Sequence, residues 1–276
     1  MFSFLKQLLQ KGELMINQNS LKVFNMILAG LILLSTSLQA DIFMKQKSHT
    51  GGFQMMGQTQ PAKDEIQDIW ISQDKIRSDS PEQSVILRLD QNKMYMLNHG
   101  EKTYAELPLD FGNVVDSKMK EAMEGEDMDP EQKESMMKMM QGMSQMKVTI
   151  TPSGETKKIG NWNCQKYIQT LETMMGPTTS EIWATEDLKM DYDLYSKFMA
   201  AMSGKGGMFG GMMTEMMEEM KKIKGVPVLT VTSMNMMGAS VKSTQELIEF
   251  KEGSAPAGIF NLPKGYKKTD DMNFQQ

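Results

Sequence analysis

Apolar and polar residues alternate along the chain from Ile42 to Leu109, and polar turn residues interrupt the alternation at short intervals. A period of two is typical of β-strands with one buried face, and the short polar gaps are typical of hairpin turns. The pattern therefore predicts an antiparallel meander. Its strands are QDIWIS, KIRSDS, SVILRLD, KMYMLN and TYAELPL, at residues 67–72, 75–80, 84–90, 93–98 and 103–109. In the third, Val85, Leu87 and Leu89 share one face, opposite Ile86 and Arg88.

The period changes to a helical one between Asp116 and Met146, with Asp129-Pro130 as helix cap and first-turn residue. Strands then resume as KVTITP and ETKKIG, on either side of a turn predicted at Ser153-Gly154, and continue as NWNCQKYIQTLE and TTSEIWAT. A second helix is predicted over 188–202, a flexible hinge at GKGGMFGG, and a third helix over 212–224. A final hairpin is predicted from PVLTVTSMNMM and ASVKSTQELIEFKE.

The order of elements indicates an α+β fold that is mainly antiparallel β. Hairpin connections dominate, and the helical segments fall where they would cover one face of a single sheet. We predict a curved, half-open β-barrel covered on its concave face by amphipathic, methionine-rich helices. Residues 41–276 would form one such domain, with helical insertions near 116–146 and 188–224.

The first 40 residues have the pattern of a secretory signal. Lys22 precedes the uncharged apolar run VFNMILAGLILLSTS, and SLQA leads into Asp41, which predicts cleavage after Ala40. The alternative is a membrane anchor, for which the run is short. Because Lys11-Gly12-Glu13 resembles a translated ribosome-binding sequence, we hypothesise that Met15 is the true start. We expect a soluble periplasmic protein with no lipid anchor, since no cysteine lies near the cut, and no stable membrane span after signal removal.

Composition argues against several classes of function. The formal net charge is −5 and no basic stripe occurs, so nucleic acid is not an expected partner. The single cysteine, Cys164, has no partner for an internal disulfide and lies in a strand pattern typical of a buried residue. With 2 histidines and no GxSxG, HExxH or paired-cysteine motif, the sequence predicts a protein that is not an enzyme and needs no cofactor.

The stretches ESMMKMMQGMSQMKV and MFGGMMTEMMEEMKK, at residues 134–148 and 208–222, are the most unusual feature of the composition. At 100° per residue, their methionines gather on one half of each helix and the charged side chains on the other. Such a face is ordinary core in many helices. Methionine, however, is pliable and specifies packing poorly, so these faces also suit a lid over a cavity whose contents change.

Methionine thioethers also bind Cu(I), which is an alternative interpretation. Met136/Met140 and Met213/Met217 lie one helical turn apart and would bind Cu(I) or Ag(I) with a further ligand. The methionines form a broad half-face rather than a compact cluster, and neither stretch contains histidine or cysteine. We therefore favour an apolar surface over a metal site. Surface methionines that consume oxidants remain a third alternative.

Several motifs together resemble a known family. DIWISQDKIRSD, MYMLNHGEKTYAELPL, KKIGNWNCQKYIQTLE followed by SEIWAT, then GVPVLTVTS and LPKGYKK, are similar to the family called domain of unknown function 4412. The resemblance covers most of residues 41–270. That family is similar in architecture to the outer-membrane lipoprotein carriers, which implies an incomplete antiparallel barrel holding acyl chains beneath helices. It brings no catalytic residues.

The expected function is the binding of a hydrophobic ligand, a lipid or the acyl chain of a lipoprotein, by an exported cell-envelope protein. The alternatives are a methionine-rich metal buffer and an envelope sensor or module that binds another envelope protein. The candidate ligand-binding residues are Met136, Met139, Met140, Met143, Met213, Met216, Met217 and Met220 as a movable wall, and Trp70, Leu87, Leu97 and Trp183 as a strand wall.

Overall fold

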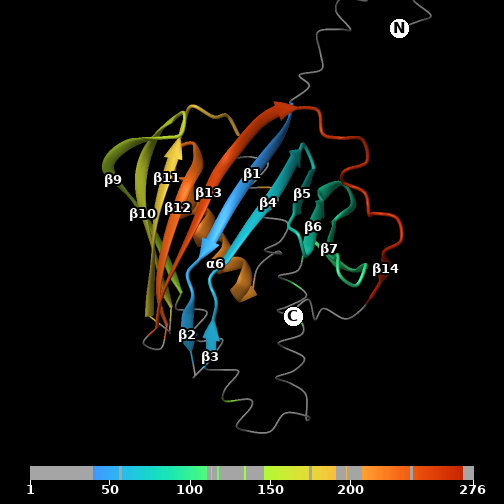
Figure 1. Cartoon of the computed structure of the whole chain (residues 1–276), viewed down its shortest axis with the longest axis horizontal. Coiled ribbons are helices and arrows are strands. Elements are labelled where there is room, and N and C mark those ends of the chain that lie inside the picture. The colour runs from blue at the N-terminus through green and yellow to red at the C-terminus, as the bar shows by residue number, and fades with distance from the viewer. Residues whose placement is uncertain are drawn as a thin grey trace, which may run out of the picture. The chain divides into compact units, whose positions relative to one another are not determined.

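The fold is given by a computed structural model of the chain, shown in Figure 1. The structure describes residues 40–55, 58–110, 146–173, 176–190, 207–236 and 239–269, together with the single positions 113, 117, 134 and 197. The chain divides into two units, Met1–Gln39 and Ala40–Gln276, and every described residue belongs to the second unit.

Twelve strands form one sheet in the order β14-β8-β7-β6-β5-β4-β1-β13-β12-β11-β10-β9. All neighbours are antiparallel except β14 and β8. The strands are β1 (Asp41–Thr50), β4 (Lys63–Ser72), β5 (Lys75–Asp79), β6 (Gln83–Arg88), β7 (Lys93–Asn98), β8 (Thr103–Pro108), β9 (Lys147–Ile159), β10 (Trp162–Thr173), β11 (Gly176–Thr185), β12 (Val226–Met236), β13 (Ala239–Gly253) and β14 (Lys267–Lys268). The other elements that lie within the described ranges are the two-stranded sheet β2 (Phe53–Met55) and β3 (Gln58–Gln60), the 3-10 helix Leu89–Gln91 and the helix α6 (Gly207–Met220).

The sheet confirms the mainly antiparallel β prediction. The meander appears as β4 to β8, and the C-terminal hairpin as β12 and β13. The sheet is curved and open, with β9 at one edge and β14 at the other (Figure 1). The predicted cover of methionine-rich helices over the concave face is not supported by the described residues. Among them, α6 packs on β9, β10 and β11, at one end of the sheet.

The turn predicted at Ser153-Gly154 is wrong. β9 runs through it without a break, and Gly154 takes a left-handed φ of 81°. Gln165 lies opposite Thr156 and Tyr167 lies opposite Pro152, so three residues of β9 face the single residue between them on β10. The Pro-Ser-Gly signal therefore makes a bulge in an edge strand, where bulges and proline are tolerated because the outer side needs no ladder partner.

The hinge predicted at GKGGMFGG is also wrong in part, because α6 already begins at Gly207. Glycine costs about 1 kcal/mol in a helix relative to alanine, but packing routinely overrides propensity. The helix ends at Met220, a few residues before the predicted end, and a turn leads to Gly225 at a φ of 86°. The predicted helices over 116–146 and 188–202 lie largely outside the described residues. Within these ranges Ser117, Glu134 and Lys197 are helical, whereas residues 188–190 are not.

The central strand of the sheet is β1, which the sequence did not place. It pairs with β13 on one side and with β4 on the other, and so joins the N-terminal meander to the C-terminal strands. Its buried residues Ile42 and Met44 pack with Val226, Val228 and Leu247 in a cluster at the middle of the sheet. In the part of the chain that the structure describes, no helix has the length and apolar character needed to cross a membrane.

Candidate functional site

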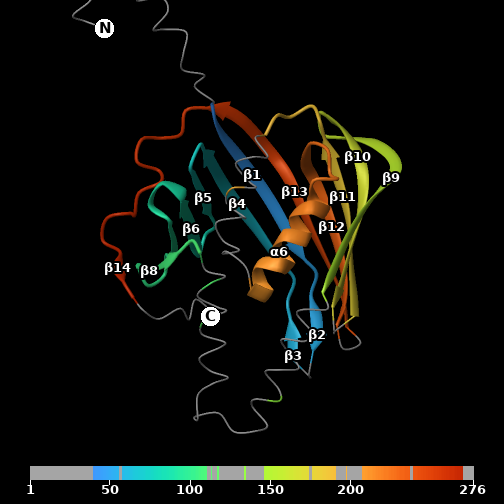
Figure 2. The same cartoon turned by 180° about the vertical axis from the view of Figure 1, so that it is seen from behind.

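Helix α6 defines the inner face of the sheet. Tyr167 on β10 and Ile182 on β11 lie opposite each other in the ladder. Both belong to a buried cluster against which Met216 and Met220 of α6 pack. Figure 2 shows α6 lying across this side of the strands. Since side chains directly opposite in a ladder share a face, the inner face can be followed strand by strand from this starting point.

The ladder carries the inner face across the whole sheet. Ile182 lies opposite Thr230, Thr230 opposite Gln245, and Gln245 opposite Ser48. The β1–β4 ladder is regular, so alternation places Met44 and Ile42 on the same face as Ser48. The meander residues that continue the cross-strand rows of Ile42 and Met44 therefore face the side on which α6 lies.

Two rows of side chains cross this part of the inner face. We call them together the apolar inner surface. The first row consists of Ile42, Ile71, Ile76, Leu87, Met94 and Leu107, and the second of Met44, Ile69, Ser78, Val85, Met96 and Ala105. Every member except Ser78 is apolar. Six adjacent strands thus present an almost purely apolar surface to one side.

Burial differs across this surface. Ile42, Met44, Met94 and Ala105 are buried, whereas the other members are only half-buried. Ile69 and Ile71 pack against the central cluster. Within the described part of the chain, Ile76, Val85, Leu87 and Met96 lie outside the three buried clusters. The apolar inner surface therefore keeps contact area that these clusters do not use.

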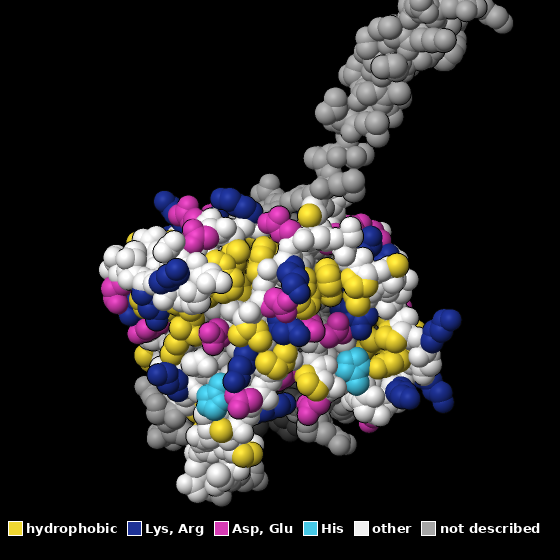
Figure 3. Space-filling view, turned by 45° about the horizontal axis from the view of Figure 1, so that its top comes forward, with side chains coloured by type: hydrophobic (Ala, Val, Ile, Leu, Met, Phe, Trp, Pro, Cys, Tyr) yellow, Lys and Arg dark blue, Asp and Glu magenta, His cyan; other side chains and the backbone are white. Residues whose placement is uncertain are grey.

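The opposite, outer face of the same strands is filled by the C-terminal segment, residues 254–269. Ile86, Tyr95 and Leu97 form a buried cluster there, against which Phe260 and Tyr266 pack. Figure 3, which shows this side tilted toward its top, has acidic, basic and apolar side chains interspersed. The two faces of the meander therefore differ in kind, because the outer one is closed by the chain's own segment.

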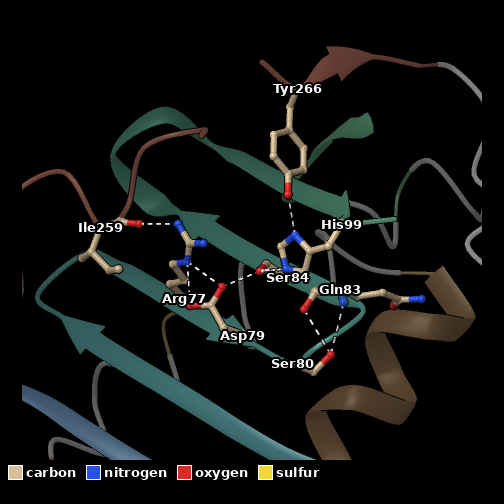
Figure 4. Close-up of polar contacts among 8 residues, drawn as sticks. All are labelled: Arg77, Asp79, Ser80, Gln83, Ser84, His99, Ile259 and Tyr266. Atoms are coloured by element: carbon tan, nitrogen blue, oxygen red, sulfur yellow. Dashed lines mark hydrogen bonds and ion pairs between the residues drawn. The ribbon is translucent and has the colours of Figure 1, made fainter. Parts of the chain in front are cut away.

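Polar groups bind the C-terminal segment to the outer face (Figure 4). Arg77 donates from Nη1 to the Ile259 carbonyl oxygen at 2.7 Å, and its Nε donates to both Asp79 oxygens at 2.8 Å. Ser84 contacts Asp79 and lies 2.8 Å from His99 Nε2, and His99 Nδ1 lies 2.6 Å from the Tyr266 hydroxyl. These bonds hold the segment at two points.

The Ser84–His99 contact has a fixed direction. A carboxylate only accepts hydrogen bonds, so Ser84 donates to Asp79. Ser84 Oγ then accepts from His99 Nε2–H, and in the neutral imidazole His99 Nδ1 accepts from the Tyr266 hydroxyl. A nucleophilic serine needs the reverse, a histidine nitrogen that accepts its proton, and it needs access, whereas Ser84 is 1% exposed. The role of this cluster is therefore structural: it holds the C-terminal segment on the outer face.

The four predicted wall residues do not share a face. Leu87 lies on the apolar inner surface. Trp70 lies opposite Arg77 on the outer face, and Leu97 is fully buried beneath the C-terminal segment. Trp183 is 6% exposed and packs in the central cluster, with Lys157 Nζ 3.9 Å from its ring centroid. The structure thus places Leu87 on this surface, apart from Trp70 and Leu97.

Two of the α6 methionines whose side chains are described pack against the buried core. Met216 and Met220 pack on the β9–β11 cluster, and Met217 is half-buried. Met213 lies within α6, but the structure does not describe its side chain. Met136, Met139, Met140 and Met143 lie outside the described residues. The metal-binding alternative, which uses Met136, Met140, Met213 and Met217, stays a prediction.

Two polar contacts fix α6 on the sheet. Glu219 Oε2 accepts from the backbone N–H of Ile150 on β9 at 2.7 Å, and the Tyr167 hydroxyl accepts from the backbone N–H of Lys224 at 3.1 Å. Hydrogen bonds from Lys222 and from Ile150 lower the pKa of Glu219 below its usual range. The charged carboxylate therefore satisfies an edge-strand donor and holds the helix to it.

The sequence reasoning missed most of the apolar inner surface. Ile76, Met94, Met96 and Leu107 were available as alternate residues of their strands. The alternation of KMYMLN places Met94 and Met96 on one face, but alternation alone does not say which face is inner. That requires the partner strands and α6.

The comparisons with known proteins address the family and not the activity. The model of the family described as a domain of unknown function (DUF4412) matches residues 49–266, which confirms the resemblance drawn from the motifs. No curated protein matches the chain.

Proposed function

We propose that this chain, which belongs to the DUF4412 family, binds an elongated hydrophobic ligand such as a lipid or the acyl chain of a lipoprotein. The observation that carries this proposal is the apolar inner surface, where two cross-strand rows contain a single polar residue, Ser78. The protein would act in the cell envelope, after export directed by the apolar leader before Asp41.

The dimensions suit a chain-like ligand. Six strands at the usual inter-strand spacing span roughly 24 Å, so the first row offers a continuous apolar track for an extended chain, and the second row is interrupted only at Ser78. Each methylene moved from water onto such a surface contributes about 0.8 kcal/mol, before the cost of immobilising the ligand. Binding would consist of burial alone, with no chemical step.

The methionines in the apolar inner surface support a ligand whose shape varies. Met44, Met94 and Met96 belong to the two rows, and a thioether side chain adapts to differently shaped partners at low cost. The methionine-rich stretch 134–148 would add a movable wall of the same character. A lid of this kind remains part of the proposal.

Lipid analysis of the protein isolated from its native host tests the proposal. Organic extraction followed by mass spectrometry is expected to release a stoichiometric amphiphile. Protein stripped of lipid should then bind the neutral probe N-phenyl-1-naphthylamine, with enhanced fluorescence. Protein that yields no lipid and also fails to bind the probe would overturn the proposal.

A matched pair of variants makes this test specific. Leu87→Asn places a polar amide on the apolar inner surface, whereas Ile66→Asn changes a residue that is 41% exposed and lies opposite Lys47 on the outer face. We expect Leu87→Asn to weaken probe binding by about tenfold and Ile66→Asn to leave it unchanged.

A further inference from the structure

A row of uncharged polar side chains borders the apolar inner surface along one side. Side chains alternate along a strand, so the residue two positions beyond each member of the second row lies on the same face. Five of these residues lie in β1, β4, β6, β7 and β8, and one directly follows β5. They are Gln46, Gln67, Ser80, Gln83, Asn98 and Thr103. Each is half-buried and has an amide or hydroxyl group. We call this row the polar border.

The ladder brings the polar border together as it does the apolar rows. Gln46 lies opposite Gln67, and Asn98 lies opposite both Gln83 and Thr103. Residues two positions apart on one face of a strand are about 7 Å apart. A polar group attached to a chain that lies along the second row therefore reaches the polar border without leaving the inner face.

The other side of the apolar inner surface has no such row. Two positions beyond the first row, on that side, the residues are mixed: Ala40, Gln73, Asp74, Leu89, Asn92 and Leu109. Leu109 is fully buried, and Gln73, Asp74 and Asn92 are turn residues. An amphiphile on this surface would consequently meet a line of uncharged hydrogen-bonding groups on one side only.

The polar border lacks charge although 24% of the chain is charged. Charged side chains begin further from the apolar rows. Glu65, two residues beyond Gln67, pairs with Lys63 at 3.8 Å, and Glu101 lies in the turn between β7 and β8. Lys267 lies opposite Thr103 at the edge of the sheet. The inner face thus passes from apolar to uncharged polar to charged, which is not the pattern of a border that is merely solvated.

The polar border has hydrogen-bonding capacity to spare. Gln46 Oε1 accepts from Gln245 Nε2 at 2.7 Å, and Asn98 Oδ1 accepts from the Glu101 backbone N–H at 3.0 Å. Among the described residues, the amide nitrogens of Gln46 and Asn98 and the whole amide of Gln67 have no hydrogen-bond partner. Because an amide NH₂ group donates, these groups suit ester carbonyl and hydroxyl oxygens.

We infer that the polar border binds the uncharged, oxygen-rich head group, such as a glyceryl ester, of a ligand whose chain lies on the apolar inner surface. The inference rests on the proposed function and adds the chemistry of the head group. Gln46, Gln67 and Asn98 donate to its oxygens. A carboxylate head group is disfavoured, because Glu65 and Glu101 lie beside the border and would repel it.

Displacement of N-phenyl-1-naphthylamine by ligands of equal acyl length tests the inference. We expect 1-monolauroylglycerol to bind the wild-type protein about fivefold more tightly than ethyl laurate, which lacks hydroxyl groups. Laurate should bind no more tightly than ethyl laurate. The variant Q46M/Q67M, which keeps the side-chain length, should lose the preference and keep its affinity for ethyl laurate. The control Q60M/Q73M makes the same exchange at exposed glutamines outside the border and should keep the preference.

The outcomes separate the two proposals. If 1-monolauroylglycerol and ethyl laurate bind the wild-type protein equally, or if laurate binds most tightly, the head-group assignment is wrong while the proposed function stands. If none of the three displaces the probe, the proposed function is wrong. A preference that survives in Q46M/Q67M, and in Gln67→Met alone, would also overturn the assignment to this border. Retained affinity for ethyl laurate shows that each variant is folded.

Discussion

The inner face of the sheet differs between its two ends. Over β9, β10 and β11 it is closed by α6, with Ile150 and Tyr167 exposed by only 1% and 2%. Over β5 and β6 it is apolar except for Ser78, yet Ile76, Val85 and Leu87 are half-buried and stand outside the buried clusters of the described residues. Both ends follow the same alternation of residues.

The two ends of the sheet use the same alternating pattern in different ways. At the closed end, apolar side chains contribute to the stability of the fold, because α6 removes them from water. At the meander end, the fold is stabilised mainly from the outer face, by the cluster of Ile86, Tyr95 and Leu97 under the C-terminal segment. Among the described residues, Ile76, Val85 and Leu87 of the inner surface belong to none of the buried clusters.

Gly225 is the position where a single methyl group should break the closed end most severely. A Cβ there would lie 2.0 Å from the Thr185 backbone oxygen, and the φ of 86° disfavours other residues. We expect Gly225→Ala to lower the free energy of unfolding by about 4 kcal/mol, measured by urea denaturation. Gly253→Ala, where an added Cβ meets nothing within 4 Å, should change it by less than about 1 kcal/mol. Equal losses of unfolding free energy in the two variants would contradict the close approach of Gly225 to Thr185.

The same truncation at the two ends should have different costs. Ile150→Ala removes a fully buried side chain and is expected to cost about 3 kcal/mol of unfolding free energy. Ile76→Ala removes a half-buried one from the apolar inner surface and should cost about 1 kcal/mol. Urea denaturation of ligand-free protein measures both. Similar losses of unfolding free energy would mean that Ile76 is buried in a closed core as Ile150 is. The contrast between the two ends of the inner face would then be wrong.

The hydrogen-bonded cluster of Ser84, His99 and Tyr266 on the outer face offers a test of whether the two faces of the meander act independently. Tyr266→Phe removes the hydroxyl that donates to His99 Nδ1 and is expected to cost about 1 kcal/mol of stability. Because the contact lies on the outer face, affinity for a neutral apolar probe should not change. A parallel loss of probe affinity in fluorescence titration would show that the faces are coupled.

The smallest effect is expected from the charge that holds α6. The pKa of Glu219 is lowered in the folded protein by Lys222 and Ile150, so its stabilisation is present above the unfolded value of 4.5 and is lost as pH falls through the lower folded pKa. Wild type should therefore melt slightly above Glu219→Gln at pH 7, and the difference should shrink as the pH falls below 4.5. A difference that stays the same as the solution is acidified would contradict the ionic role.

The strands of the meander were predictable because each one alternates regularly and ends at a polar turn. Local patterns failed where tertiary contacts decide. Pro152, Ser153 and Gly154 have the composition of a turn, yet pairing with β10 absorbs them as a bulge. Gly207 to Gly211 have the composition of a hinge, yet they are the start of α6.

The site was predictable only in part. The alternation of SVILRLD placed Val85 and Leu87 together, as the ladder does, but the predicted strand wall also included Trp70 and Leu97, which lie on the other face. The choice of the inner face depends on β1 pairing with β13, a contact between residues about 200 positions apart. No local pattern contains that information.

Photolabelling tests the central claim most directly. The ligand-free protein is mixed with a palmitate analogue that carries a diazirine near the end of its chain, irradiated, digested and analysed by mass spectrometry. We predict labels on the apolar inner surface, at Leu87, Met94 or Met96, which excess unlabelled palmitate removes. Labels confined to outer-face residues such as Trp70, or no label that palmitate removes, would contradict the account.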